Sequence, residues 1–268
     1  MNPLLSFLLL FFIGSMAGWV MEFFFRRFFA PGKKWVNPGF LTGPLLPIYG
    51  FGTCTLFLLA ETEPYLPVEN AVLRKLALFL LMAVCMTVIE YIAGLIFIIG
   101  LKTRLWDYSN EKFNLQGIIC LRFSLIWAAL GAVYDFLIHP ALADVIVWFR
   151  GNLQFCFVLG AVFGVFVMDV AYSFQVVAKI RAFAKENDIL VRYEELKATI
   201  RKTAAEQKKK YRFLFALRPE VPIREHLAKY LEFVHALDEA GKNARKHTRE
   251  QLDGRKRGKK AEDNSDNR

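Results

Sequence analysis

Five stretches of this sequence are long enough and apolar enough to cross a membrane as helices. They are residues 3–25, 43–60, 73–100, 115–138 and 153–177. A bilayer-spanning helix needs roughly 20 mostly apolar residues, and a chain with 55% hydrophobic residues and 26 Phe is too apolar for an ordinary soluble domain. The sequence therefore predicts an all-α fold, that of a polytopic membrane protein with about five transmembrane helices.

Lys and Arg residues between the apolar stretches predict how the chain is oriented. They concentrate between the first and second stretches, between the third and fourth, and after residue 177. Cytoplasmic segments are enriched in Lys and Arg, so we expect the N-terminus outside and the tail in the cytoplasm (N-out, C-in). Ser15-Met16-Ala17 resembles a signal-peptide cleavage site, but no basic residue precedes the first apolar run, which favours an uncleaved helix.

The charge divides the chain into a membrane part and a tail. Residues 1–177 hold 11 of the 35 Lys and Arg, and the remaining 24 follow. We expect a transmembrane helical domain over residues 1–177, a basic helical cytoplasmic tail over 178–250 and a disordered C-terminus over 251–268, where hydrophobic residues are few. One helical face of the tail carries four apolar residues, Ile189, Tyr193, Leu196 and Ile200.

Three kinds of partner are open for this basic tail. Anionic membrane lipid is the first, because each Lys or Arg near an anionic surface adds roughly 1 kcal/mol of attraction. A docking protein is the second. Nucleic acid is the least expected, because charge gives a sequence-independent attraction and the sequence shows no recognised RNA or DNA module. A homo-oligomer also stays open.

The second apolar stretch begins irregularly, because Gly43, Pro44 and Pro47 crowd its first residues and interrupt a helix. One interpretation is a re-entrant turn or a helix that starts near Pro47. The other is a broken helix at a transport site, since irregular backbone at membrane depth is tolerated where protein or a watery cavity covers it.

Four ionisable residues fall within the apolar stretches near their predicted inner ends. They are Glu22, Glu90, Arg122 and Asp169. Each would cost roughly 2.5–3.5 kcal/mol if it faced lipid at mid-depth. We therefore expect one inward-facing polar cluster, with Arg122 between Glu90 and Asp169. Three interpretations are open: a structural ion pair that fixes helix register, a path for an ion or polar solute, or a catalytic site.

Two segments of the chain share a motif that indicates a duplicated helical hairpin. Each has a Glu, a Trp, an Asn and a Gly in this order: Glu22, Trp35, Asn37 and Gly39, then Glu90, Trp106, Asn114 and Gly117. Asp107 and Ser109 favour an Asx-type turn, and Asn114 can cap the fourth helix. Two interpretations are open: an interfacial belt of aromatic and capping residues, or a ligand or partner site at the inner mouth.

Five sequence blocks in this part of the chain are similar to a known family. They are GWVMEF (Gly18 to Phe23), GFLTGPLLPIYGFG (Gly39 to Gly52), IEYIAG (Ile89 to Gly94), WDYSNEKFN (Trp106 to Asn114) and GIICLRFSLIW (Gly117 to Trp127). The chain resembles the bacterial integral-membrane proteins called ABC-transporter permeases, type IV. The resemblance implies a multi-pass protein of the bacterial cytoplasmic membrane with a permease label.

The family motifs and the depth argument together select the candidate site residues. The resemblance selects Glu22, Asn37, Tyr49, Glu90, Trp106, Asp107, Tyr108 and Asn114. Arg122 and Asp169 are added because we expect them in the inner-leaflet cluster.

The sequence carries no motif of an ATPase or of a common hydrolase. It has no GxxxxGK[ST] phosphate-binding loop, no HExxH, no GxSxG and no paired CxxC. We therefore expect no enzyme activity, no cofactor and no metal, and any ATP must be hydrolysed by a separate subunit.

These observations favour a permease-like transport component with a polar site in the inner leaflet and no ATPase of its own. The alternative is a non-transporting membrane scaffold or sensor whose basic tail binds anionic lipid or a protein partner. An insertase-like helper is a third hypothesis, suggested by analogy in span number, orientation and basic tail.

Overall fold

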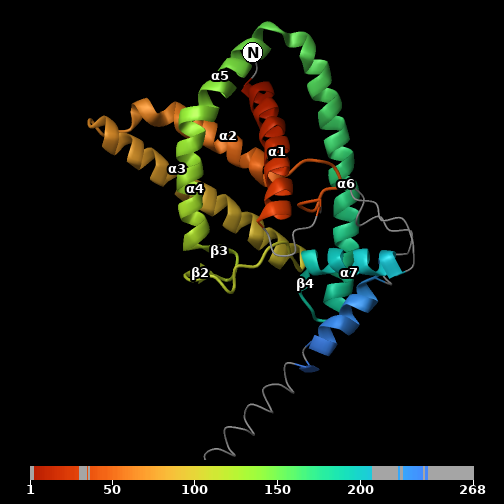
Figure 1. Ribbon diagram of the computed structural model, residues 1–268. Helices are drawn as coiled ribbons and strands as arrows, with labels where there is room; N and C mark the ends of the chain where they lie inside the picture. Colours follow the sequence, from red (N-terminus) through yellow and green to blue (C-terminus); the bar gives the residue numbers. More distant parts are fainter. Residues whose placement is uncertain are drawn as a thin grey trace, which may run out of the picture. The chain divides into compact units, whose positions relative to one another are not determined.

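The computed structural model describes residues 3–29, 35, 37–206, 223, 226–237 and 239–240. The chain forms two compact units, Met1–Glu220 and Val221–Arg268. The first unit is mostly helical, as the sequence predicts (Figure 1). The C-terminus expected to be disordered, residues 251–268, lies outside the described residues.

The elements of the first unit are long helices joined by short turns and strands. Its α-helices are α1 (Pro3–Phe28), α2 (Pro47–Thr62), α3 (Ala71–Leu95), α4 (Leu121–Val133), α5 (His139–Gly151), α6 (Cys156–Glu186) and α7 (Tyr193–Glu206). Short 3-10 turns are η1 (Glu63–Tyr65) and η4 (Leu153–Phe155), and π-helical turns are η2 (Ile96–Gly100) and η3 (Tyr134–Ile138). The strands are β1 (Thr103–Arg104), β2 (Asn114–Leu115), β3 (Ile119–Cys120) and β4 (Val191–Arg192). In the second unit, residues 226–237 are helical.

Four helical runs of the described chain are long and apolar enough to span a membrane. They are Pro3–Phe28, Ala71–Gly100, Leu121–Gly151 and Leu153–Glu186. The fifth expected span, 43–60, becomes α2, whose 16 residues extend about 24 Å against about 30 Å of hydrocarbon. The length of α2 therefore reduces the expected five spans to four candidates. The N-out, C-in orientation stays a prediction.

α2 begins at Pro47, one of the starts that the sequence leaves open. Pro is favourable there because the first helical N–H has no intrahelical partner. Residues 37–46 before it are irregular, and we call them the re-entrant segment. Leu46, at its end, donates its N–H to the carbonyl of Ser15 at 3.0 Å. Ser15 lies about 20 Å before the end of α1, so the segment returns to the middle of α1 before the chain becomes helical.

The fourth apolar stretch differs from the expected 115–138 at both ends. Its helix begins at Leu121, because β2 and β3 form a hairpin there, with Gln116 and Gly117 at φ of 55° and 67°. The helix then continues through η3 into α5. Pro140 does not end it, because the missing N–H of Pro140 falls in the first turn of α5 after the π-helical turn.

Glycines let α1 and α2 approach each other closely. A side chain at Gly14 or Gly18 of α1 would collide with Thr53 or Tyr49 of α2. This contact places Tyr49 beside the C-terminal half of α1. The adjoining apolar core joins α1, α2, α3 and α5 and includes Leu10, Leu56, Met82 and Ile146.

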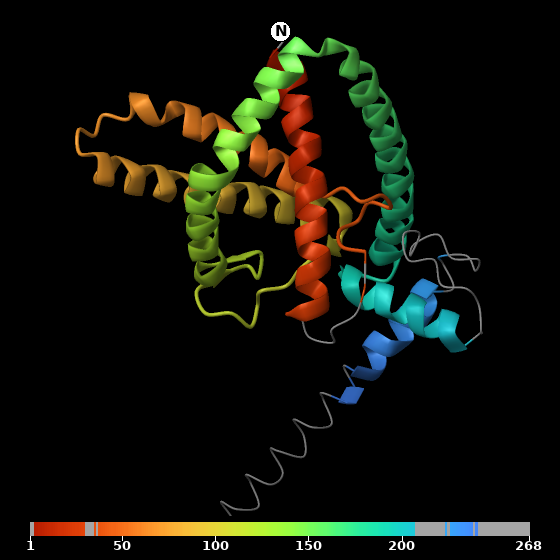
Figure 2. The same cartoon turned by 45° about the horizontal axis from the view of Figure 1, so that its top comes forward.

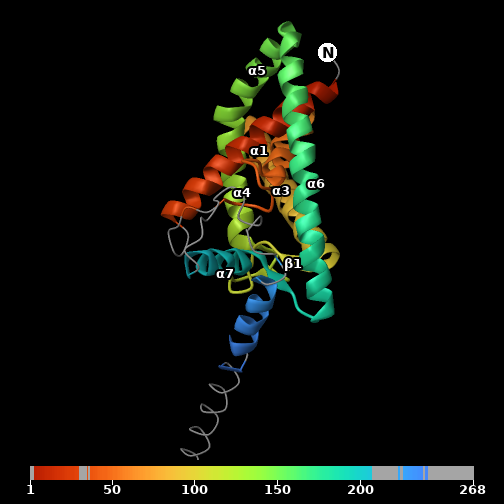
Figure 3. The same cartoon turned by 90° about the vertical axis from the view of Figure 1, so that its right-hand side faces the viewer.

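The C-terminal ends of α1, α3 and α6 and the N-terminal end of α4 lie toward the same end of the first unit, the lower end in Figure 1; Figure 2 shows the same helices turned by 45°. β1 follows α3 and pairs in parallel with β4, which follows α6, so that Thr103 lies opposite Val191. α7 comes next and crosses this end of the unit (Figure 3). The apolar face expected in this segment is buried at Tyr193, Leu196 and Ile200.

Candidate functional site

The re-entrant segment is held by an Asn side chain of its own. Asn37 is 3% exposed and accepts a hydrogen bond from Nε1 of Trp19 on α1 (2.6 Å). Its Nδ2 donates to the carbonyls of Leu41 (3.3 Å) and Thr42 (3.0 Å). Asn37 therefore closes the turn through Gly39, whose φ of 74° is accessible to glycine at little cost.

Asp169 of α6 satisfies the backbone of the same segment. Its carboxylate accepts the N–H groups of Thr42 (3.0 Å) and Gly43 (2.8 Å), and it also accepts the hydroxyl of Ser173 (3.3 Å). Irregular backbone at membrane depth needs such partners, because water is not there to replace them. The charge of Asp169 is thus directed at backbone N–H groups.

α7 covers the re-entrant segment with two polar side chains. Lys197, which is 5% exposed, donates from Nζ to the carbonyls of Asn37 (2.9 Å) and Gly39 (2.7 Å). The hydroxyl of Tyr193 donates to the carbonyl of Phe40 (3.2 Å). Burial lowers the pKa of Lys197 to about 8. The tail is therefore joined to the membrane part at this point.

Glu22 of α1 belongs to a chain of polar contacts that runs from α2 to α7. It accepts the hydroxyl of Tyr49 on α2 (3.3 Å) and pairs with Arg26 (3.0 Å) one turn further along α1. Arg26 pairs in turn with Glu194 of α7 (2.9 Å), which is 3.8 Å from Lys197. Glu22 therefore has a positive partner on its own helix.

Glu90 of α3 is 6% exposed and is held by two ring-bearing residues. Its Oε1 accepts the hydroxyl of Tyr108 (3.0 Å), and its Oε2 accepts Nε1 of Trp127 on α4 (3.0 Å). The ring centroid of Trp127 is 6.2 Å from that of Tyr49. Because Tyr49 also binds Glu22, the surroundings of the two Glu residues adjoin.

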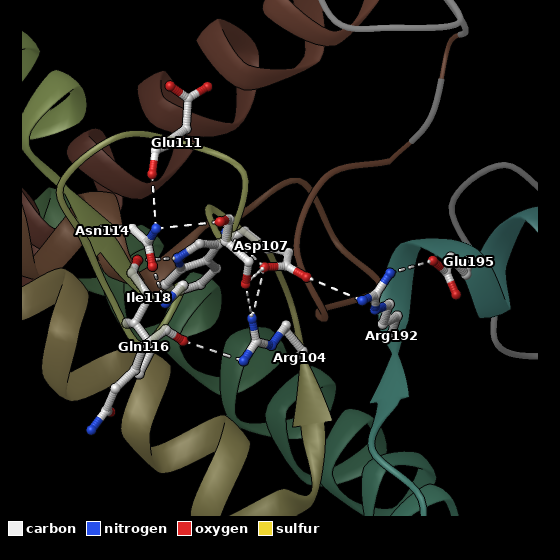
Figure 4. A network of polar contacts seen from close by, with 11 residues as sticks. Arg104, Asp107, Glu111, Asn114, Gln116, Ile118, Arg192 and Glu195 are labelled. Carbon is white, nitrogen blue, oxygen red and sulfur yellow. Dashed lines mark hydrogen bonds and ion pairs between the residues drawn. The ribbon is translucent and has the colours of Figure 1, made fainter. Parts of the chain in front are cut away.

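Tyr108 belongs to residues 101–120, which we call the Tyr108 loop. Charged residues tie this loop to the tail (Figure 4). Arg104 donates to Asp107 (2.7 Å), and Arg192 of β4 lies 3.5 Å from the other carboxylate oxygen. Burial and the neighbouring Glu90 raise the pKa of Tyr108 above its ordinary value, so this phenol stays protonated and can donate.

Asp107 also forms the Asx turn that the sequence predicts. Its Oδ1 accepts both the N–H (3.0 Å) and the hydroxyl of Ser109. Burial alone would raise the pKa of Asp107, but the hydrogen bonds from Ser109 and the charge of Arg104 outweigh it, so the pKa lies below its ordinary value. Asp107 is therefore an ionised anchor of the Tyr108 loop at neutral pH.

Asn114 holds the same loop and does not cap a helix. Its Nδ2 donates to the carbonyls of Ser109 (3.3 Å) and Glu111 (2.8 Å), and its Oδ1 accepts the N–H of Gly117 (3.1 Å). The predicted capping role is wrong, because α4 begins only at Leu121.

Arg122 does not lie between Glu90 and Asp169, so the predicted cluster around it is wrong. Its side chain is 67% exposed and pairs with Glu111 of the Tyr108 loop at 3.2 Å. The reason is again the start of α4. Because the helix begins at Leu121, Arg122 lies in its first turn, at the end of the apolar run and not inside it.

The two copies of the duplicated motif share the geometry of their Asn and Gly residues. In each copy the Asn side chain binds two backbone carbonyls of its own loop, and the Gly that follows has a positive φ. The Trp residues differ. Trp106 donates Nε1 to the carbonyl of Ile118 (2.8 Å), whereas Trp35 is exposed and packs against Phe23.

Several residues of the site are missing from the predicted set. Trp19 and Trp127 lie inside the family blocks. A buried Trp usually donates its ring N–H to an acceptor, and this tendency could have selected both residues. Lys197 had no such signal, because one Lys in a basic tail is expected to be solvated.

A second polar cluster, at the other end of α3, was also missed. Lys75 pairs with Glu63 (2.6 Å) and with Asp135 of η3 (2.6 Å), whose side chain is 4% exposed. Asp135 lies within the apolar stretch 115–138, which is the same signal that selected Glu90. Among the described residues, no group of three or more His, Cys, Asp or Glu could hold a metal.

The fold and the site define a multi-pass helical membrane protein, in which apolar helices of spanning length enclose an irregular segment and buried carboxyl groups. The chain belongs to the family described as "Putative ABC-transporter type IV", whose family model matches residues 9–174. The resemblance found in the sequence is thereby confirmed. The match contains every predicted site residue and ends before α7. No curated protein and no solved structure was found to match the chain.

Proposed function

We propose that this chain is a permease-like transport component of the bacterial cytoplasmic membrane, with no ATPase of its own. Its polar site lies in the inner leaflet, where Glu22, Tyr49, Glu90 and Tyr108 adjoin the re-entrant segment. The N-terminus is outside, and the basic tail lies in the cytoplasm against anionic lipid.

The re-entrant segment is the observation that carries this proposal. A membrane anchor needs no irregular backbone at depth, because continuous helices satisfy their own hydrogen bonds. Here Asn37, Asp169 and Lys197 all serve to satisfy one irregular segment beside the middle of α1. Interrupted helices that expose backbone groups at a central site are a recurrent feature of transporters.

α7 offers a separate partner a means of acting on the site. It binds the re-entrant segment through Lys197, and β4 before it binds the Tyr108 loop through Arg192. A cytoplasmic protein that displaces α7 would therefore displace both segments. We propose a separate ATPase subunit as that partner, because the family name implies ATP and the sequence has no phosphate-binding loop.

Purification of the tagged full-length protein from its own membranes tests this proposal. The membranes are treated with a chemical cross-linker, extracted in mild detergent, and the co-purifying proteins are identified. A protein with a GxxxxGK[ST] motif, recovered in a fixed ratio, supports the proposal. Recovery of the chain without any ATPase contradicts it. Gly151→Ala is the matched control, because a Cβ at Gly151 would meet no other atom within 4 Å and the substitution should leave the ratio unchanged.

The alternative function is a non-transporting scaffold or sensor, and the pairing of the charges favours it. Arg26 and Asp107 each lie between two oppositely charged partners, as in a bundle fixed by ion pairs. In a scaffold, Glu90→Gln should chiefly lower the amount of folded protein. In a permease it should spare assembly. The yield of monodisperse protein in detergent, measured against the wild type, separates the two functions.

A further inference from the structure

Glu22 and Glu90 occupy the same place in the duplicated motif but differ in charge compensation. Four residues after Glu22 stands Arg26, which pairs with it at 3.0 Å. Four residues after Glu90 stands Gly94, where any side chain would collide with Ile118. The second hairpin therefore has no room for a basic residue in the position that neutralises Glu22 in the first.

The groups that face Glu90 are neutral. Tyr108 and Trp127 donate to its two oxygens, and no Lys, Arg or His of the described residues forms an ion pair with it. Among the described residues, Tyr49 of α2 is a further titratable group near Glu90, and Glu22 and Arg26 lie beyond it. A buried carboxylate without a counter-ion is unfavourable inside a membrane, and binding a proton removes its charge.

We propose that Glu90 binds an exchangeable proton and that the Tyr108 loop responds to it. The indole N–H of Trp127 can only donate, so Oε2 stays an acceptor in both protonation states. The proton therefore binds Oε1, which faces the hydroxyl of Tyr108. A phenolic hydroxyl both donates and accepts, so it donates to the carboxylate and accepts from the carboxylic acid. Proton uptake therefore reverses this one hydrogen bond. The only covalent bond broken is the one between the proton and the group that delivers it.

The reversal changes how firmly the Tyr108 loop is held against α3. In the ionised state the bond from Tyr108 to Glu90 is charge-assisted, and in the protonated state it is an ordinary bond between neutral groups. Asp107 joins the same loop to Arg192 of β4. Protonation of Glu90 thus weakens the attachment of the loop to α3, while the attachment of the loop to the tail is unchanged.

This inference deepens the proposed function, because it names the proton as the ion to which the permease site responds. It does not require transport, however, since proton binding is measured directly. Failure of the ATPase purification would leave it standing, and its own failure would leave the permease proposal standing.

Infrared spectroscopy of the full-length protein in liposomes tests the inference. The C=O stretch of protonated carboxyl groups is recorded from about pH 5 to about pH 9 for the wild type, Glu90→Gln and Glu22→Gln. We expect a protonated-carboxyl band at neutral pH that is lost in Glu90→Gln and kept in Glu22→Gln. Absence of any Glu90-dependent band over this range would overturn the inference.

Tyr108→Phe is the second variant, and it tests the link to the loop without removing the carboxyl group. Loss of the phenolic donor removes a bond that favours the ionised form, so the midpoint of the Glu90 band should move up by about one pH unit. A midpoint equal to that of the wild type would show that Tyr108 does not respond to the proton. The shift of the midpoint in Tyr108→Phe also tests proton binding at Glu90 if the Glu90→Gln variant fails to fold.

Discussion

Asn37, Asn114 and Asp169 were predicted as members of a polar site, and each binds backbone groups of a loop. This use of side chains follows from the irregular segments that they hold. A buried carbonyl or N–H outside a helix needs a partner, and a short amide or carboxylate can supply one. At the scale of residues, these three side chains serve the backbone, whereas Glu90 is held by the side chains of Tyr108 and Trp127.

Gly117→Ala should destabilise the protein by about 1–2 kcal/mol, because φ of 67° is unfavourable for any residue with a Cβ. The new methyl group would also press on Ser109 and Arg104 of the Tyr108 loop. Gly151→Ala is the matched control, since its Cβ would meet open space, and its effect should stay within about 0.5 kcal/mol. The free energy of unfolding in detergent measures both. Equal losses in the two variants would contradict the role assigned to Gly117.

The buried Lys197 should make stability depend on alkaline pH. Its folded-state pKa of about 8 lies below the ordinary 10.5, so the unfolded chain binds the proton more tightly. Stability contributed by this group is therefore absent below about pH 8 and rises as the pH increases to about 10.5. Between pH 7 and pH 10.5 the wild type should gain roughly 3 kcal/mol relative to Lys197→Met.

Unfolding of wild type and Lys197→Met at the two pH values measures this gain. Lys179→Met is the control, because Lys179 is exposed on α6 and its removal should leave the pH dependence of the wild type intact. A constant difference between wild type and Lys197→Met would show that Lys197 is solvated in the folded protein.

At the scale of elements, α7 is joined to the membrane helices more closely than a solvated basic tail would be. β4 pairs with β1, and the face of α7 that carries Tyr193 is buried. The amphipathic pattern predicted a helix here. It could not show which surface the helix covers, because the apolar pattern of one helix does not identify the surface against which that helix packs.

Cysteines at Thr103 and Val191 should form a disulfide in a variant whose four native cysteines are replaced. The two residues are partners in the parallel pair β1–β4, and both are fully buried. Neighbouring strands lie about 4.8 Å apart, which is within the range of a disulfide. Mild oxidation followed by gel electrophoresis without reductant detects the closed loop.

The matched control for this cross-link is Thr103→Cys with Arg192→Cys. Successive side chains of a strand point to opposite faces, so this pair should cross-link far less than the pair at Thr103 and Val191. Equal cross-linking of the two pairs would contradict the register of β1 against β4.

At the scale of the whole molecule, the orientation in the membrane is open to a direct test. Glu69 precedes α3 and Lys112 follows it in the Tyr108 loop, and both are exposed. The helical run Ala71–Gly100 between them extends about 45 Å, so the two positions should lie on opposite sides of the membrane.

A membrane-impermeant maleimide should label Glu69→Cys on intact cells and Lys112→Cys only after the cells are broken, because N-out, C-in orientation places the Tyr108 loop in the cytoplasm. Both variants are made without the native cysteines. The reverse pattern would invert the orientation, and labelling of both from outside would exclude a crossing between them.

The lengths of the apolar runs and the preferences of single residues determined much of this protein from sequence alone. The helical membrane class and the Asx turn at Asp107 follow from local chemistry, and a helix start near Pro47 was one of the alternatives that the sequence left open. The family follows from five sequence blocks between Gly18 and Trp127.

The partners of the charged residues were decided by the tertiary structure. Moving the start of the fourth helix from residue 115 to Leu121 took Arg122 out of the apolar run, and the return of residues 37–46 to the middle of α1 gave Asp169 backbone partners instead of a cation. Such pairings depend on where helices begin and which of them pack together. Hydropathy is averaged over a whole helix, so it places a charge to within a few residues, whereas an ion pair requires its atoms to be about 4 Å apart.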